Sequence, residues 1–171
     1  MINCVSIIVP YFRQAHYLRD CLASLRAQAY QDGEASIVND GSPDNTRAVV
    51  AELMAVDPRV RYVEQPNGGL SAARNAGMAV ARGDALQFLD ADDLLQSRKV
   101  EHQVAVLNAR PDVDVIYGGA RYLSDGEPDK LSFNLLPGQY EEDWIQARWT
   151  AWLSASPGFV RFNLFPVCSP L

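Results

Sequence analysis

The sequence predicts an α/β fold with a mostly parallel central sheet. Short β-branched runs alternate with segments whose apolar residues recur at the helical period, over about the first 123 residues. Five strands read this way are separated by four helices, an alternation that places successive strands parallel in one layer. With 171 residues, 48% of them hydrophobic and 21% charged, the chain has the composition of an ordinary globular protein.

The first strand is predicted at Val5–Val9, a β-branched run that ends at Pro10. A helix over residues 17–30 follows, because four apolar residues share one helical face: Leu18, Leu22, Leu25 and Ala29. The second strand is predicted at Ala35–Asn39.

The second helix is expected to begin with Ser42 as N-cap, Pro43 in its first position and Asp44 in its first turn. Pro58 should end it. Its inward stripe is predicted to be Val49, Leu53 and Val56.

The third strand is predicted at Val60–Val63, and the third helix at residues 71–81 after a break at Gly68–Gly69. Small side chains on this helix permit a close approach to the sheet: Ala72, Ala73 and Ala76. The fourth strand is predicted at Ala85–Leu89.

The fourth helix is predicted over residues 98–108 and the fifth strand at Val113–Tyr117. The inward residues of this helix should be Val100, Val104 and Leu107. His102 and Gln103 lie off that stripe, so His102 is interpreted as a solvated residue and not as a ligand.

The pattern weakens after Leu123. Residues 125–129 are predicted to form a turn, a stretch with three tryptophans follows (Trp144, Trp149 and Trp152), and residues 162–171 are interpreted as strand and loop. The sequence ends without a capping element, so we expect a cut within a longer protein. Two regions are predicted, residues 1–123 and residues 124–171.

Charge and cysteine content exclude several classes. The net charge is −6 and no basic run occurs, which argues against nucleic-acid or anionic-lipid binding. Cys4, Cys21 and Cys168 are too scattered for a disulfide framework or a zinc site, and we expect buried thiols in a reducing cytosol. No apolar run reaches the ~18 residues of a membrane span, and the start of the chain is read as mature sequence.

Polar side chains follow the predicted strands at the sheet edge where ligands bind in open α/β folds. Asp40 follows the second strand. An ionised carboxylate only accepts hydrogen bonds, so it suits the ring N–H of uracil, thymine or guanine, and not adenine or cytosine. The alternative is that Asp40 simply begins a tight turn.

An acidic cluster follows the fourth strand: Asp90, Asp92 and Asp93. A divalent cation would relieve their mutual repulsion and neutralise a diphosphate, although solvation on an exposed rim could relieve it in part. No glycine-rich dinucleotide motif or P-loop motif occurs.

Four segments occur in an order that resembles a known family. They are Val5–Pro10, Asn39–Thr46, Asn67–Gly77 and Phe88–Asp93. Together they are similar to the family 2 glycosyltransferases of GT-A fold, over about residues 3–123. The resemblance implies a Rossmann-like three-layer sandwich whose first region binds a nucleotide sugar, with residues 124–171 as the start of an acceptor-side region.

The resemblance also implies roles for residues. Pro10 and Phe12 would line the base, Phe12 by stacking, and Asp40 would bind the base N–H, usually of uracil. Asn67 and Arg74 would contact the nucleotide. Asp90 and Ala91 would lie near the ribose, and Asp92 of the Asp-x-Asp motif would bind Mn²⁺ or Mg²⁺ through the donor diphosphate.

Arg74 and Asn75 could alternatively be a plain helix-surface pair. The sequence departs from the family pattern at Asn39, where an acid is usual, and at Arg13, where asparagine is common.

The resemblance implies sugar inversion by direct displacement, with a later acid deprotonating the acceptor hydroxyl. Asp143 matches the motif of that acid superficially, but it comes too early in the chain. We therefore expect the base beyond Leu171, and a fragment that binds the donor but turns over poorly or not at all.

The expected partners are a nucleoside-diphosphate sugar, with UDP preferred, and a saccharide or lipid-linked acceptor, as in polysaccharide or cell-envelope synthesis. The expected location is the cytoplasm, including its membrane face. The alternative is a non-catalytic nucleotide-binding or docking domain of the same fold. A phosphatase is disfavoured because its paired acids follow the first strand.

Overall fold

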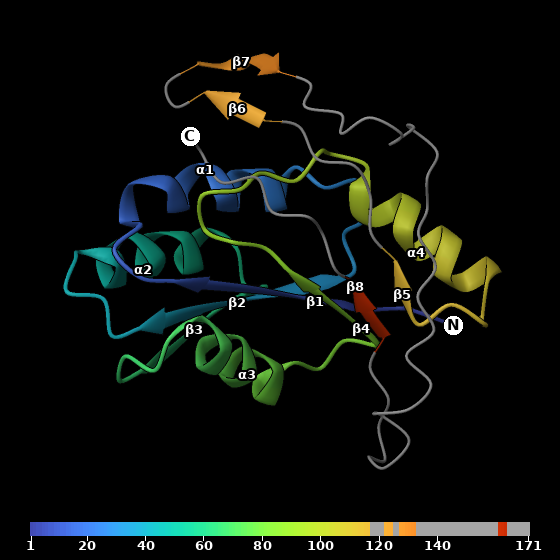
Figure 1. Cartoon of the computed structure of the whole chain (residues 1–171), viewed down its shortest axis with the longest axis horizontal. Helices are drawn as coiled ribbons and strands as arrows, with labels where there is room; N and C mark the ends of the chain where they lie inside the picture. The colour runs from blue at the N-terminus through green and yellow to red at the C-terminus, as the bar shows by residue number, and fades with distance from the viewer. Residues whose placement is uncertain (117–121, 125–126, 133–160, 164–171) are drawn as a thin grey trace.

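The computed structural model describes residues 1–116, 122–124, 127–132 and 161–163. Its centre is a six-stranded sheet in which every pair is parallel, with the order β3-β2-β1-β4-β8-β5 (Figure 1). The strands are β1 (Val5–Tyr11), β2 (Gly33–Asp40), β3 (Val60–Gln65), β4 (Ala85–Phe88), β5 (Val115–Ile116) and β8 (Arg161–Asn163). The predicted α/β class with a parallel sheet is confirmed.

Helices cover both faces of the sheet, which gives three layers (Figure 1). They are α1 (Ala15–Arg26), α2 (Thr46–Val56), α3 (Leu70–Val80) and α4 (Lys99–Ala109). The buried side chains of α1, α2 and α4 belong to one apolar cluster, whereas Ala73 of α3 belongs to a second cluster. The sheet therefore has α3 on one face and the other three helices on the opposite face.

Strand β1 is buried along its whole length, as expected for a central parallel strand. Its side chains alternate between the two clusters: Ile7 and Val9 pack toward α1, and Ile8 packs toward α3. This alternation fixes the register of β1 between β2 and β4, because a slip of one residue would exchange the two apolar faces.

Helix α3 lies very close to the sheet at Gly77. A Cβ atom at this position would be 2.3 Å from Cγ2 of Ile8 and 3.2 Å from Cγ2 of Val38. Only a residue without a side chain fits there. The predicted close approach is confirmed, with Ala73 fully buried one turn earlier.

Two helix predictions need correction. Helix α2 begins at Thr46 with Asn45 as its N-cap, so Ser42, Pro43 and Asp44 precede the helix. Its buried residues are Thr46 and Val50, whereas Val56 is 59% exposed. Leu53 packs against the core as predicted. The helix starts later than predicted because Ser42 and Asp44 are held in a separate hydrogen-bonded turn.

Gln103 in α4 was expected off the inward stripe but is buried, beside Val100, Val104 and Leu107 as predicted. His102 is exposed.

In α1 the predicted face is confirmed for its leucines, but the helix ends at Arg26 and Ala29 is exposed. The segment after α1 is instead held by Gln28, whose buried amide donates to Gln96 O and accepts from Val100 N.

A second, two-stranded antiparallel sheet is made of β6 (Tyr122–Ser124) and β7 (Glu127–Ser132). Residues 127–129 are therefore strand, and not part of the predicted turn. The predicted division into residues 1–123 and 124–171 stays a prediction. Trp144, Trp149 and Trp152 lie outside the described residues.

Cys21 is buried, as predicted, whereas Cys4 is half-buried, and both are free thiols. Burial raises the pKa of the Cys21 thiol, and the acids of the 90–93 cluster add to this effect. Cys168 lies outside the described residues.

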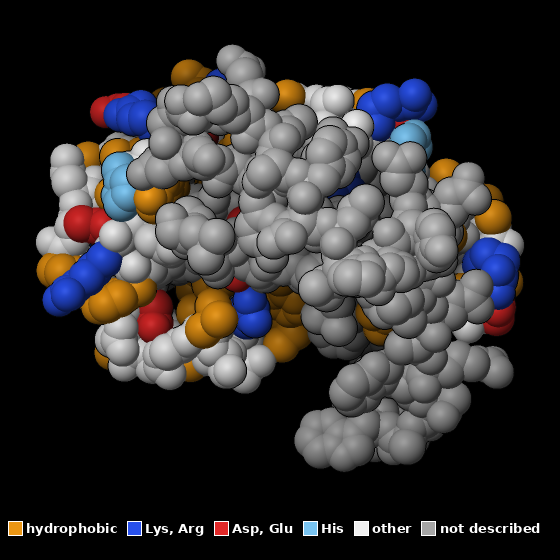
Figure 2. All heavy atoms as spheres, turned by 45° about the horizontal axis from the view of Figure 1, so that its top comes forward, with side chains coloured by type: hydrophobic (Ala, Val, Ile, Leu, Met, Phe, Trp, Pro, Cys, Tyr) orange, Lys and Arg blue, Asp and Glu red, His pale blue; other side chains and the backbone are white. Residues whose placement is uncertain are grey.

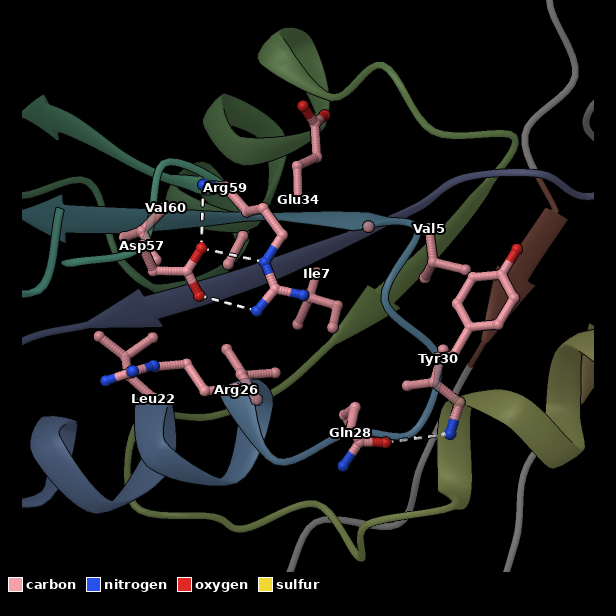
Figure 3. Close-up of a pocket in the computed structure, with 14 residues that line it drawn as sticks. Val5, Ile7, Leu22, Arg26, Gln28, Tyr30, Glu34, Asp57, Arg59 and Val60 are labelled. Atoms are coloured by element: carbon pink, nitrogen blue, oxygen red, sulfur yellow. Dashed lines mark hydrogen bonds and ion pairs between the residues drawn. The ribbon is translucent and has the colours of Figure 1, made fainter.

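A small cavity of about 30 Å³ lies near the amino ends of β1, β2 and β3 (Figure 3). Asp57 and Arg59 lie on its wall, joined by Arg59 Nη2–Asp57 Oδ2 at 2.8 Å and Arg59 Nε–Asp57 Oδ1 at 2.9 Å. The space is about that of one water molecule, so we interpret this end of the sheet as structural.

Candidate nucleotide-binding site

A second and much larger cavity, of about 500 Å³, lies at the carboxyl ends of the strands. Its walls come from β1, β2, α3 and the segments that follow β1, β3 and β4. They are formed by Pro10, Tyr11, Phe12, Gln14, Asp40, Asn67, Gly69, Leu70, Ala73, Asp90 and Asp92. Six residues that the sequence analysis singled out thus come together: Pro10, Phe12, Asp40, Asn67, Asp90 and Asp92.

Asp40 is the last residue of β2 and is buried. Its Oδ1 accepts hydrogen bonds from Gln65 Nε2 at 2.7 Å and from Gly68 N at 2.8 Å, and its Oδ2 accepts one from Gly69 N at 2.8 Å. Burial alone would raise the pKa of this carboxyl, but the three hydrogen bonds outweigh it and hold the pKa below its usual value. The carboxylate is therefore ionised at neutral pH.

The backbone around Asp40 is tied to the loop that follows β3. Asn67 Nδ2 donates to Asp40 O at 3.0 Å. Gly41 has φ of 70°, and a Cβ there would be 2.7 Å from Asn67 N. Both its backbone conformation and its surroundings therefore require glycine.

The turn before α2 is held by side chains. Asn39 Oδ1 accepts from Ser42 N, and Asn39 Nδ2 donates to the Tyr62 hydroxyl, both at 2.7 Å. Asp44 accepts hydrogen bonds from Ser42, Thr46 and Ala15 N. Asn39 stands where the family usually has an acid, and its amide supplies the donor that an acid would lack.

Phe12 is 39% exposed at the mouth of the cavity. The guanidinium carbon of Arg13 lies 5.1 Å from the centre of its ring, within the range of a cation–π contact. Arg13 has φ of 59°, a left-handed conformation that asparagine adopts more readily than arginine. Its backbone N–H donates to Ser42 Oγ at 2.9 Å, which links this segment to the turn before α2.

Asp90 lies in the cavity wall and is paired with Arg74, which is not itself in the wall. Arg74 Nη2 lies 2.9 Å from Asp90 Oδ1, and the guanidinium lies over the Phe88 ring at 5.6 Å. Arg74 is thus more than a surface residue of its helix, whereas Asn75 is exposed. Ala91 is fully buried and does not line the cavity.

The carboxylates that follow Asp90 are crowded. Burial, together with the charge of Asp90, raises the pKa of the Asp92 carboxyl, although a hydrogen bond with Gln14 opposes the shift. Burial and the charges of Asp92 and Asp90 raise the pKa of Asp93 to about 7. Both shifts mark a place where added positive charge would be favourable.

The donor set fits a hard divalent cation. Asp92 presents carboxylate oxygens to the cavity, and Mg²⁺ and Mn²⁺ prefer oxygen ligands. Within the described part of the chain, no group of three or more His, Cys, Asp or Glu side chains could hold a metal ion. An ion at Asp92 would therefore need oxygen ligands from the substrate and from water, which is how Mg²⁺ commonly binds beside phosphates.

Five residues of the cavity wall had no binding role assigned from the sequence: Tyr11, Gln14, Gly69, Leu70 and Ala73. Gly69 has φ of 84° and precedes α3, so the Gly68–Gly69 pair was a usable signal. Gln14 carried no signal, because it reaches Asp92 only through the fold. Asp143 lies outside the described residues.

Figure 2 shows the Lys and Arg side chains of the described residues spread over the visible face, without one basic patch. None of the described helices is both long and apolar enough to cross a membrane.

The chain is similar to known proteins over most of its length. Residues 6–165 match the model of "Glycosyl transferase family 2". An uncharacterized glycosyltransferase of Rickettsia felis is 36% identical over 147 residues, covering 78% of this chain and 24% of the relative. Chondroitin synthase of Pasteurella multocida is 42% identical over 100 residues, 58% of this chain and 10% of that protein. The chain thus spans about a quarter or less of these relatives.

Solved structures support the fold. TarS of S. aureus aligns with a TM-score of 0.63 at 22% identity, covering 68% of this chain and 21% of TarS. The mannosyltransferase PcManGT of Pyrobaculum calidifontis, in complex with GDP-Man and Mn²⁺, aligns with a TM-score of 0.63 at 24% identity, covering 71% of this chain and 36% of that one. The resemblance found in the sequence is confirmed: the chain belongs to glycosyltransferase family 2 and has the GT-A fold.

Proposed function

We propose that this chain binds the donor of a glycosyltransferase that moves a sugar from a nucleoside diphosphate, UDP in preference, to a hydroxyl group. The observation that carries the proposal is the 500 Å³ cavity, which gathers an aromatic ring, an ionised acceptor and two further carboxylates at one sheet edge. Each of these groups suits one part of a nucleotide sugar.

The base would lie between Phe12 and Asp40. An exposed aromatic ring offers a stacking surface, and an ionised carboxylate accepts a ring N–H. Uracil has such an N–H. Pro10 and Asn67 complete this part of the wall.

The diphosphate would lie toward Asp90 and Asp92, with Asp92 as the protein ligand of Mn²⁺ or Mg²⁺. A divalent ion there would neutralise the charge of the leaving diphosphate. Arg74 would hold the Asp90 carboxylate in place. Burial and the charge of Asp90 raise the pKa of Asp92, and the same cation would oppose both effects by stabilising the ionised carboxylate.

Structural neighbours support the substrate class. TarS has been solved with UDP and with UDP-GlcNAc, and PcManGT with GDP-Man and Mn²⁺. Their identity to this chain is 23–24%, so they support a nucleotide-sugar donor without selecting the base or the sugar.

The acceptor would attack the anomeric carbon directly, with inversion, after a base takes its proton. The matched part is 24% of the Rickettsia felis relative and 10% of the chondroitin synthase. We therefore propose that the 171 residues bind the donor, that the base is supplied by a segment outside them, and that turnover by this chain is slow or absent. The proposed acceptor is a saccharide or lipid-linked hydroxyl, in the cytoplasm or at the inner membrane face.

The test is calorimetric titration of UDP in Mn²⁺ and in EDTA, on wild type and on Asp92→Ala. Asp20→Ala, which removes an exposed carboxylate of α1 outside the cavity wall, is the control. We expect binding that needs Mn²⁺, is lost in Asp92→Ala and is kept in the control. If folded wild type binds none of UDP, TDP and GDP, the result would favour the alternative interpretation, in which the chain is a non-catalytic docking domain.

A further inference from the structure

The Asp40 carboxylate has room for one more hydrogen bond. A carboxylate offers about four lone-pair sites, two on each oxygen. Oδ1 already accepts from Gln65 Nε2 and Gly68 N, and Oδ2 accepts from Gly69 N. One site on Oδ2 is left by these three contacts.

Nucleobases differ in how many donors they present to such a group. Uracil and hypoxanthine have one ring N–H on the pairing edge. Guanine has the ring N–H and, next to it, an exocyclic amino group, so its edge matches a carboxylate with both oxygens available. A carboxylate with one remaining site can pair with the ring N–H but leaves the guanine amino group without an acceptor, and a polar group buried without a partner lowers affinity.

Gln65 is the side chain that fills Oδ1. The other two donors are the backbone amides of Gly68 and Gly69, whose positions are set by the path of the backbone. Gln65 is the last residue of β3, where it pairs in register with Asp40, and its Nε2 is 2.7 Å from Oδ1. The orientation of its amide follows from chemistry, because an ionised carboxylate cannot donate and so must face the NH₂ group.

We propose that Gln65 determines base specificity: by occupying Oδ1 of Asp40, it leaves the site able to pair with a base that has one N–H donor and unable to pair fully with guanine. The inference rests on the proposed nucleotide site. It assigns a selective role to a residue outside the cavity wall, acting through Asp40 as a positioning residue.

GDP and IDP make the sharpest pair of probes, since they differ only in the exocyclic amino group. UDP, GDP and IDP are titrated calorimetrically in Mn²⁺ into wild type, Gln65→Met and Gln96→Met. Methionine has nearly the length of glutamine but no N–H donor. Gln96 is an exposed glutamine outside the cavity wall, which makes it the matched control.

In wild type and Gln96→Met, we expect GDP to bind no better than IDP. In Gln65→Met, the lone-pair site on Oδ1 that Gln65 occupied can accept a hydrogen bond from the guanine amino group. The affinity for GDP relative to IDP should therefore rise about tenfold. The affinity for UDP should change less than threefold.

An unchanged GDP-to-IDP ratio in a Gln65→Met variant that still binds UDP would overturn the inference, as would a variant that binds UDP but neither purine. Should Gln65→Met lose UDP binding, Gln65→Ala is titrated in the same way. Loss of UDP in both variants would assign Gln65 to holding Asp40 in place, and the inference would also fail. Failure of wild type to bind UDP is a separate result, which refutes the proposed function itself.

Discussion

Arg74 on α3 and Asp90 after β4 form an ion pair, 2.9 Å from Nη2 to Oδ1, that joins a helix to the acidic side of the cavity. Their side chains are 31% and 19% exposed. Arg74 Nε is buried and has no hydrogen-bond partner among the residues that the structure describes, so this guanidinium keeps donor capacity beyond the pair.

Arg74→Met should weaken UDP binding in Mn²⁺ about tenfold, because Asp90 would lose the group that holds its carboxylate in place and the site would lose a positive charge near the anionic diphosphate. The free energy of unfolding should fall by only about 1 kcal/mol, since the pair is partly exposed to solvent. Calorimetry and urea unfolding measure the two effects. Arg98→Met, which breaks an exposed pair with Glu101, is the control and should change neither quantity much. Equal UDP affinity in Arg74→Met and wild type would show that the pair is purely structural.

Asp40→Asn should damage both binding and stability. An amide has one oxygen, so whichever way it turns, its NH₂ group faces a donor that the carboxylate accepted. We expect a loss of about 1–3 kcal/mol in the free energy of unfolding and a loss of UDP binding of at least about tenfold. Urea unfolding and calorimetry test this, with Asp20→Asn as the control on an exposed acid. A variant that matches wild type in both would contradict the assigned contacts.

Gly77→Ala tests the close approach of α3 to the sheet. In a helix interior, alanine is favoured over glycine by about 1 kcal/mol. Here the added Cβ would lie 2.3 Å from Ile8 Cγ2, and overpacking of a core costs about 1–3 kcal/mol. We therefore expect net destabilisation, measured by urea unfolding.

Ile8→Ala is the partner substitution for a double-mutant cycle, because it removes the atoms that the new Cβ meets. The two substitutions together should cost less than the sum of the single costs, by about 1 kcal/mol. Additive costs would mean that α3 shifts away from Ile8 as a whole.

The pair Asp57–Arg59 should make stability depend on pH. The hydrogen bonds from Arg59 lower the pKa of Asp57 and outweigh the opposing effect of burial. A carboxyl whose pKa is lower in the folded state contributes stability above its unfolded pKa of about 3.9, and that contribution is lost as the pH falls through the folded pKa.

Asp57→Asn should therefore lower the free energy of unfolding at pH 7 by about 1 kcal/mol, discounted for the 31% exposure of Arg59. The variant should approach wild type as the pH falls below about 3.9 and through the folded pKa of Asp57. Urea unfolding between about pH 2 and pH 7 gives both curves. Asp112→Asn, in an exposed pair with Arg110, is the control. Parallel curves for Asp57→Asn and wild type would refute the assigned shift.

Much of the fold follows from local pattern. The alternation of buried strands and amphipathic helices places Asp40, Asp90 and Asp92 at one edge of a parallel sheet, because strands in a parallel layer end on the same side. The small residues of α3 likewise indicate the close approach that Gly77 makes to Ile8. Each strand and helix in this arrangement is predicted from residues that are near one another in the sequence.

The errors arose where tertiary contacts override local pattern. Gln103 was placed off the inward stripe of its helix, yet it is buried in α4. Ser42 resembles an N-cap, but its hydroxyl donates to Asp44 and accepts from Arg13 N, and the helix begins four residues later. Likewise, the partners of Asp40 come from Gln65 and the glycine loop, which only the folded chain brings within reach.

Strand β8 has three residues, and it lies between β4 and β5 although it comes far later in the chain than either. Among the described strands, β5 pairs with β8 and with no other, so β5 has no place in the sheet until residues 161–163 arrive. Bringing together strands that are so far apart in the chain costs entropy and slows folding. The order of assembly follows: β3, β2, β1 and β4 can form first, and the far edge of the sheet is completed last.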